Sequence, residues 1–159
     1  MQSEWLQRTE LLVKEEGIER LQSANILIVG LGGVGSFAAE FLVRSGIGNL
    51  TIVDGDTVDI TNINRQLPAL NSTIGKNKND VVAERILDIN PEINLKKINK
   101  FLEPERMEEI LTQEKFDYVL DCIDSLSPKL ALIITCKRKK IKLVSAMGAG
   151  GKTDPSKVM

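Results

Sequence analysis

The sequence contains no histidine, and this absence limits the chemistry that the chain can carry out. It excludes a histidine general base, Ser-His and Cys-His dyads, and every metal site with an imidazole ligand. There are only two cysteines, Cys122 and Cys136, and they lie too far apart in sequence for a paired-cysteine zinc site. We expect both to be small buried residues in a reducing compartment.

Long apolar runs and an excess of charge are also missing. No apolar stretch is long enough to cross a bilayer, and the first twenty residues are amphipathic and charged. We therefore expect no signal peptide, no membrane segment and a cytoplasmic location. The 21 basic and 22 acidic residues give a net charge of −1, so any attraction to nucleic acid must come from a local basic patch.

What the sequence does contain is a glycine-rich turn between an apolar run and a helical pattern. Residues 25–35 read NILIVGLGGVG, in which a short buried strand is followed by Gly30, Gly32, Gly33 and Gly35. Glycines let the chain reverse tightly and let a phosphate approach backbone N–H groups. The helix that begins there points its free N–H groups and the positive end of its dipole at the same place. The spacing therefore predicts a nucleotide phosphate site.

An acidic residue after the second apolar run supports this prediction. Residues 50–53 are followed directly by Asp54, which lies nineteen residues after Gly35. A carboxylate at this position suits the hydroxyl pair of a ribose. The same pattern serves NAD, FAD or ATP, and a glycine-rich turn that binds nothing is the alternative. The pattern thus favours a fold and a nucleotide without fixing the reaction.

The rest of the chain alternates between apolar runs and helical spacing, which predicts an α/β fold with a doubly wound, mostly parallel sheet of Rossmann type. A helical lead-in, residues 1–24, precedes the domain of residues 25–159, and we expect a break in the lead-in at Gly17. The expected strands are residues 26–29, 50–53, 93–98, 116–120 and 141–146, and the expected helices are residues 34–44, 75–90, 103–111 and 127–140. The inner face of the first of these helices is expected to consist of Phe37, Ala38, Phe41 and Leu42.

Two cations and an acid are predicted at the carboxyl edge of this sheet, where ligands of open α/β sheets bind. Arg65 lies in the long connection after the second strand, Lys78 near the start of a helix, and Asp124 directly after a strand. Arg65 could direct two N–H groups at a triphosphate, Lys78 adds a point charge, and Asp124 could hold Mg²⁺. Each also has a simpler explanation, as a loop cap, a solvated charge or a helix N-cap. Together they favour chemistry on a triphosphate.

Several motifs follow one another in a recognisable order along nearly the whole chain. They are GLGGVGS (30–36), TIVDGDTVDITNINRQ (51–66), GKNK (75–78), INP (89–91) and DCIDS (121–125). In this combination the chain resembles the ubiquitin-activating-type adenylating family, which includes ThiF, MoeB and HesA. The resemblance implies ATP as the nucleotide, Mg²⁺ as the metal and a homodimer as the assembly. It also implies that Arg8 is the amino-terminal arginine that reaches into the site of the partner subunit.

The resemblance further assigns roles within the motifs. Asp54 would bind the ribose, and Asn62 and Arg65 would bind the phosphates. Lys78 matches the characteristic lysine of the family, and Asp124 matches its metal-binding aspartate. The implied nucleotide-binding set comprises the four glycines of the turn, Asp54, Asp56, Asn62, Arg65, Gln66, Lys78, Asp124 and Ser125.

Within the family the chain is most similar to members that act on tRNA. The similar segments are RTELLVKEEGIERL (8–21), NRQLPAL (64–70), DSLSPKLALI (124–133) and SAMGAGGKTDPSKV (145–158). This resemblance implies ATP-dependent activation of the threonylcarbamoyl carboxylate on a modified adenosine next to the anticodon, followed by ring closure with net loss of water. Such members continue past residue 159 with a half that helps bind substrate, so we expect this chain to be truncated at its C-terminal end.

Two other functions stay open at this point. The first is adenylation of the C-terminus of a ubiquitin-like sulfur-carrier protein, in a sulfur-carrier or cysteine desulfurase system. The second is an NAD-dependent oxidoreductase or a simple nucleotide-binding module. The second explains the glycine turn and Asp54, but it leaves Arg65, Lys78 and Asp124 without a role.

Overall fold

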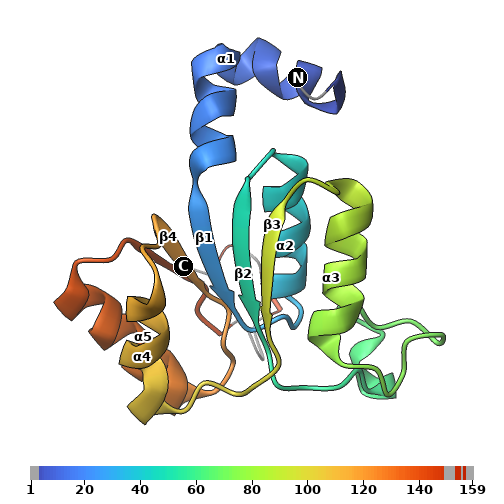
Figure 1. The fold of residues 1–159 in the computed structure, drawn as a ribbon. Coiled ribbons are helices and arrows are strands. Elements are labelled where there is room, and N and C mark those ends of the chain that lie inside the picture. The colour runs from blue at the N-terminus through green and yellow to red at the C-terminus, as the bar shows by residue number, and fades with distance from the viewer. Residues whose placement is uncertain (1–3, 149–152, 155, 157–159) are drawn as a thin grey trace.

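A computed structural model describes residues 4–148, 153, 154 and 156, and it contains a five-stranded parallel sheet (Figure 1). The strands lie in the order β3-β2-β1-β4-β5, so the direction in which the sheet grows reverses at β1. This confirms the predicted doubly wound α/β fold. The strand bounds are Asn25–Val29 for β1, Asn49–Val53 for β2, Asn94–Ile98 for β3, Tyr118–Asp121 for β4 and Leu143–Ser145 for β5.

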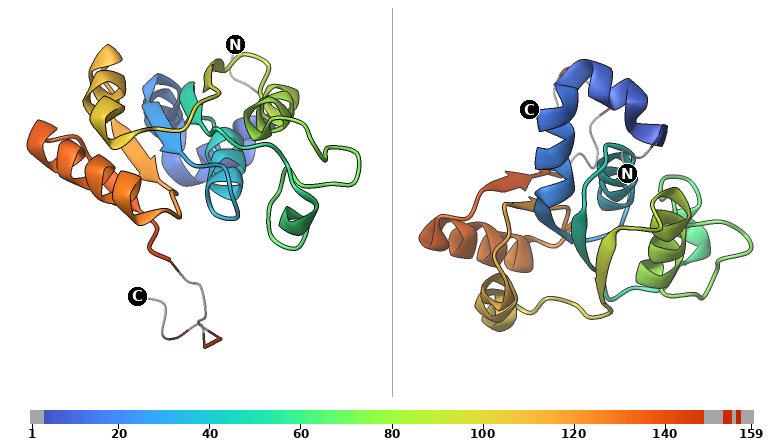
Figure 2. Two further views of the ribbon diagram at one scale, coloured as in Figure 1. Left: turned by 90° about the horizontal axis from the view of Figure 1, so that it is seen from below. Right: turned by 45° about the horizontal axis from the view of Figure 1, so that its top comes forward.

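Helices cover both faces of the sheet and form three layers with it (Figure 2). One face carries α2 and α3, and the other carries α4 and α5, as right-handed crossovers on either side of β1 require. Short 3₁₀ turns occupy Glu4–Leu6, Ile60–Asn62 and Pro104–Arg106. The α-helices are Gln7–Ser23 (α1), Gly35–Arg44 (α2), Lys78–Ile89 (α3), Met107–Gln113 (α4) and Leu126–Lys139 (α5).

The central strand β1 is buried on both faces, because successive side chains of a strand point in opposite directions. Ile26 and Ile28 pack into the core beneath α2 and α3. Leu27 and Val29 pack into a second core with residues of α4 and α5. This double burial explains the uninterrupted apolar run that predicts the strand in the sequence.

The lead-in helix is broken, but the break does not lie at the predicted glycine. The backbone of Lys14 has φ 62° and ψ 175°, and helical geometry resumes after it. The turn at Lys14 brings Val13 against Gly17, where an added Cβ would lie 2.5 Å from the Cβ of Val13. The prediction of a break at Gly17 was therefore wrong. Gly17 instead leaves space for the side chain of Val13, which the break at Lys14 places against it.

The inner face of α2 also differs from the prediction. Phe37 and Phe41 are 40% and 65% exposed, while Ala38 and Leu42 are only partly buried. The helix packs so closely on the turn after β1 that a Cβ on Gly35 would lie 1.7 Å from the carbonyl oxygen of Gly30. Such close packing requires small residues, and large rings turn outward. The buried residues of α2 are Gly35, Ser36, Ala39, Glu40 and Val43.

Part of the glycine-rich motif 145–158 lies outside the described residues, namely 149–152, 155, 157 and 158. The described part begins with Ser145 of β5 and continues through Ala146, Met147 and Gly148. No helix among the described residues combines the length and the apolarity needed to cross a lipid bilayer.

Candidate functional site

A cavity of about 660 Å³ lies at the carboxyl ends of the strands, where the strand order reverses. Its volume is typical of small-molecule sites, and its position is the one that open α/β sheets use for ligands. Loops after β1, β2, β3, β4 and β5 all contribute to its wall. The residues that the sequence nominated and that line it are Gly30, Gly32, Gly33, Asp54, Asp56, Arg65, Gln66, Lys78, Asp124 and Ser125.

The glycine turn forms one wall of the cavity and leads directly into α2. Gly30 has φ +92°, a conformation that glycine adopts at little cost, and an added Cβ would lie 2.7 Å from the carbonyl oxygen of Cys122. Its N–H donates to the carbonyl of Val53 at 2.8 Å, which joins the turn to the end of β2. Gly32 and Gly33 border the cavity, and α2 begins at Gly35. The turn therefore presents backbone and the N-terminal end of a ten-residue helix to any ligand.

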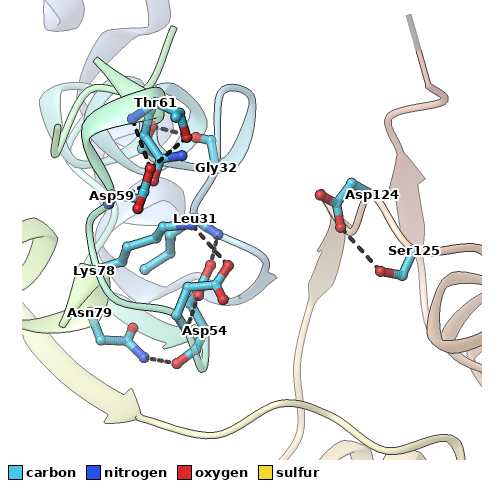
Figure 3. A network of polar contacts seen from close by, with 12 residues as sticks. Leu31, Gly32, Asp54, Asp59, Thr61, Lys78, Asn79, Asp124 and Ser125 are labelled. Atoms are coloured by element: carbon cyan, nitrogen blue, oxygen red, sulfur yellow. Dashed lines mark hydrogen bonds and ion pairs between the residues drawn. The ribbon is translucent and has the colours of Figure 1, made fainter. Parts of the chain in front are cut away.

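Asp54 connects the end of β2 to this turn (Figure 3). Its Oδ2 accepts a hydrogen bond from the N–H of Leu31 at 2.6 Å, and its Oδ1 accepts one from the N–H of Asp56 at 2.8 Å. The buried amide of Asn79 donates to the carbonyls of Asp54 and Ile98 at 2.8 and 2.9 Å, so α3 holds the ends of β2 and β3 together. The carboxylate of Asp54 is thus fixed at the cavity wall.

Lys78 is the first residue of α3, and its nearly buried side chain lines the cavity. The Nζ atom lies 2.9 Å from Oδ2 of Asp56, and the side chains of Lys78 and Asp56 are 6% and 51% exposed. An ammonium has three N–H donors, and this ion pair uses one of them. The charge is therefore held in a fixed position with further donors available to a ligand.

The segment that contains Arg65 packs against the glycine turn, since a Cβ on Gly33 would lie 3.2 Å from the carbonyl oxygen of Arg65. The Nη1 atom of Arg65 donates to the carbonyl of Thr61 at 3.1 Å and to Oδ1 of Asn64 at 2.9 Å. Both bonds use one nitrogen, so they engage only part of the five-donor guanidinium. Arg65 thus lines the cavity with donating capacity to spare.

Gln66, the next residue, also lines the cavity. Its Oε1 atom is buried and has no hydrogen-bond partner within the described part of the chain. Buried acceptors in proteins are nearly always paired, so an orphaned one calls for an explanation. The other end of the same amide, Nε2, lies beside the glycine turn, 3.7 Å from where a Cβ on Gly32 would be.

Asp124 and Ser125 lie on the opposite side of the site from Asp54 and Lys78 (Figure 3). Ser125 Oγ donates to Oδ1 of Asp124 at 3.3 Å, and both side chains are exposed. The described residues contain no group of three His, Cys, Asp or Glu side chains that could hold a metal alone. Mg²⁺ is commonly held by one or two carboxylates together with substrate phosphates, so a single carboxylate facing a phosphate site fits this ion.

Comparison with known proteins decides the family. The model of the ThiF family matches residues 6–159. The chain belongs to the ThiF family.

Individual relatives agree with this assignment. The chain is 47% identical over 147 residues to tRNA threonylcarbamoyladenosine dehydratase from Haemophilus influenzae. The aligned region covers 92% of the chain and 56% of that protein. It is 38% identical to molybdopterin-synthase adenylyltransferase of the same organism, over 82% of the chain and 53% of that protein. The crystal structure of the Escherichia coli dehydratase TcdA in complex with ATP matches with a TM-score of 0.92 and 44% identity, over 98% of the chain and 65% of TcdA. The chain therefore spans little more than half the length of the curated relatives that it matches.

Three nominated residues do not line the cavity of this ThiF-family chain. Gly35 lies behind it, where the start of α2 packs against Gly30 and Cys122. Asn62 is buried and accepts a hydrogen bond from the N–H of Asp59 at 3.1 Å, as part of the capping box of a 3₁₀ turn. Arg8 is exposed on α1, which precedes β1 and lies at the amino ends of the strands, opposite the cavity (Figure 1).

Sequence reasoning missed the segment that follows β3. Lys100, Phe101, Leu102 and Pro104 line the cavity, and the ring of Phe101 is exposed. A Cβ on Gly55 would lie 2.7 Å from that ring, so the loop after β2 needs a glycine beside it. An aromatic residue shortly after an expected strand on the carboxyl edge was the available signal.

The two cysteines are free; Cys136 is buried as predicted, but Cys122 is only partly buried. Cys122 lines the cavity, and burial together with the charge of Asp121 raises the pKa of its thiol to about 11. Cys136 is fully buried in the core between the sheet and α5, and burial raises its pKa to about 11 as well. Since the thiolate is the nucleophile, neither residue is activated for nucleophilic catalysis at neutral pH.

Proposed function

We propose that this chain is the nucleotide-binding part of an enzyme that uses ATP to activate the threonylcarbamoyl carboxylate of a modified tRNA adenosine. A carboxylate oxygen attacks the α-phosphorus of ATP, and the bond to pyrophosphate breaks. A nucleophile of the same side chain then displaces AMP and closes a ring, with net loss of water from the modified base. The observation that carries this proposal is the meeting of a glycine turn, two cations and an acid at one cavity. The names of the relatives support this choice of substrate.

In this proposal, residues of the cavity bind the phosphates and the ribose of the nucleotide. Asp54, fixed at the end of β2, accepts hydrogen bonds from the ribose hydroxyls. The glycine turn and the N-terminal end of α2 take the phosphates. Arg65 and Lys78 stabilise the negative charge that increases as pyrophosphate leaves, and losing one such donor costs about 3–4 kcal/mol of barrier. Adenylation of this kind needs positioning and charge neutralisation, which a site without histidine can supply.

The base and the metal have their own contacts in this scheme. The exposed ring of Phe101 offers a stacking surface to the adenine at the rim of the cavity. Asp124 would hold Mg²⁺, which neutralises phosphate charge when it is bound. Asn62 does not contact the nucleotide in this scheme. Its side chain stabilises the 3₁₀ turn that precedes Arg65 and so helps to position that arginine.

We also propose that the enzyme is a homodimer. Arg8 belongs to α1, which lies at the amino ends of the strands, whereas the cavity of the same chain lies at their carboxyl ends, so another subunit would have to bring Arg8 to a nucleotide. The outer face of α2 offers an apolar surface for such a contact, since Val34, Phe37 and Phe41 are exposed side by side on successive turns. Light scattering tests the mass, and Phe41→Lys should shift a dimer towards monomer.

The alternative acceptor is the C-terminus of a ubiquitin-like sulfur carrier. The similarity to molybdopterin-synthase adenylyltransferase supports it, at lower identity than the similarity to the tRNA enzymes. An NAD-dependent reaction leaves Arg65, Lys78 and Asp124 without a role. A tRNA-modifying function also agrees with the predicted cytoplasmic location.

Exchange of labelled pyrophosphate into ATP, measured with the full-length enzyme, tests the proposal. Exchange that requires tRNA bearing threonylcarbamoyladenosine supports it, and exchange that requires a sulfur carrier instead favours the alternative. Arg65→Ala should abolish turnover and leave the melting temperature unchanged. Arg20→Ala is the matched control, since Arg20 is an exposed arginine on α1, far from the cavity, that pairs with Glu16. Absence of exchange with either acceptor would refute the proposal.

A further inference from the structure

A buried ion pair lies directly behind the cavity wall, and no role in the proposed reaction accounts for it. The Nζ atom of Lys129 is 2.7 Å from Oδ2 of Asp121, and the two side chains are 7% and 0% exposed. Lys129 comes from the first turn of α5, and Asp121 is the last residue of β4. The same ammonium donates to the carbonyl of Ala146 at 2.9 Å.

This pair joins the two loops that leave β4 and β5. Oδ1 of Asp121 accepts from the N–H of Ile123 at 3.1 Å, and Oδ2 accepts from Oγ of Ser145 at 2.6 Å. The N–H of Ala146 donates to the carbonyl of Asp121 at 2.9 Å. Ile123 and Ala146 themselves line the cavity. Both loops are thus tied to one ammonium and one carboxylate.

The chemistry of the pair indicates a function in geometry rather than in stability. Taking two charges out of water is costly, and apolar residues of similar volume often serve stability equally well or better. What an apolar pair cannot do is to direct several hydrogen bonds at fixed backbone atoms. Lys129 and Asp121 do this for both loops, and Asp124 lies one residue beyond the anchored Ile123.

We propose that Lys129 is a positioning residue of the nucleotide site, an inference that rests on the proposed function. Through Asp121 it holds the loop of residues 122–125 so that Asp124 faces the phosphate end of the cavity. Through the carbonyl of Ala146 it holds the start of the glycine-rich segment against the same loop. Lys129 itself touches neither nucleotide nor metal.

The test compares two double variants that each replace an ion pair by neutral residues. Asp121→Asn with Lys129→Met removes the proposed anchor without leaving a buried charge unpaired. Glu40→Gln with Arg85→Met is the control, because that pair joins α2 to α3 away from the cavity. For each protein, calorimetry gives the affinity for ATP in EDTA and in excess Mg²⁺, and hydrogen exchange follows the amides of Ile123 and Ala146.

We expect the first double variant to keep its affinity for ATP in EDTA. The gain in affinity that Mg²⁺ brings should fall about tenfold or more, as is usual when a residue that orients a metal ligand is lost. The two amides should exchange about tenfold faster or more, because the loops open locally. The control variant should change neither quantity.

A folded first variant with the wild-type Mg²⁺ effect and wild-type exchange overturns the inference. If that variant does not fold, Ser145→Ala takes its place, because it removes only one donor to Asp121. It should lower the Mg²⁺ effect on ATP affinity and speed the exchange of the two amides, each by a smaller factor. If neither quantity changes, the inference is overturned. If the wild-type protein binds no ATP, the proposed function fails and this role fails with it. The amide exchange then still shows separately whether the pair fixes the loops.

Discussion

Replacing Gly32 by alanine separates nucleotide binding from folding. The φ of Gly32 is one that alanine can adopt, and the added Cβ meets only the amide nitrogen of Gln66, at 3.7 Å, which is an ordinary contact. The melting temperature should therefore stay the same or rise slightly, since alanine restricts the unfolded chain more than glycine does. The new methyl group, however, enters the wall against which the phosphates are proposed to lie.

An intruding methyl group in a tightly packed contact costs about 1–3 kcal/mol. At about 1.4 kcal/mol for each factor of ten, ATP should bind roughly 5- to 150-fold more weakly. Calorimetric titration with ATP and a thermal melt of the same sample measure both effects. Unchanged affinity in a folded Gly32→Ala protein would refute the placement of phosphates on the turn.

Gly35→Ala is the contrasting variant. Its Cβ would lie 1.7 Å from the carbonyl oxygen of Gly30, a clash with backbone that no side-chain rotation relieves. We expect a loss of about 3 kcal/mol or more in the free energy of unfolding. Gly148→Ala is the control for folding, because its Cβ would meet nothing within 4 Å. Equal stability of the Gly32 and Gly35 variants would contradict the reasoning.

Three further predictions concern single side chains. Lys78→Met keeps the buried stem and leaves Asp56 half exposed, so stability should fall by less than about 1 kcal/mol while ATP binding weakens at least about tenfold in calorimetry. The Arg85 guanidinium lowers the pKa of Glu40 below its usual value of 4.5, so this stabilisation is present at neutral pH and is lost as the pH falls through the lowered pKa. Urea unfolding at successive pH values should show about 1 kcal/mol of this loss in wild type and not in Glu40→Gln. Cys122, with its pKa near 11 against 9.0 for an unperturbed thiol, should react with iodoacetamide at neutral pH roughly a hundredfold more slowly than a peptide thiol, as mass spectrometry can follow.

The sequence predicts the fold well where local pattern and tertiary environment agree. The apolar run of β1, the glycine turn after it and the acid at the end of β2 all occur where expected. The cavity residues follow from the same logic, because the carboxyl ends of parallel strands meet at one edge. Arg65, Lys78 and Asp124 could be placed together without knowing a single contact.

The errors arise where a contact distant in sequence decides the outcome. Spacing alone favours Phe37 and Phe41 as the buried face of α2, but the close contact of Gly35 with Gly30 turns another face inward, and the two rings are exposed. The break at Lys14 depends on the packing of Val13 against Gly17, and helix propensities of single residues do not predict such a contact. The ion pair of Lys129 with Asp121 is a different case: the two residues are only eight positions apart, but their spacing does not indicate that both charges are buried.

The central position of β1 has a consequence for how the chain acquires its binding site during synthesis. β1 pairs with β2 on one side and with β4 on the other, and β4 begins nearly a hundred residues after β1 starts. A growing chain can assemble β1, β2 and β3 early, but one edge of its most apolar strand stays bare until residue 121 has left the ribosome. Bare strand edges invite pairing with other chains. The emerging polypeptide is therefore most vulnerable to aggregation just before the second wall of the cavity arrives, and nucleotide cannot protect it until then.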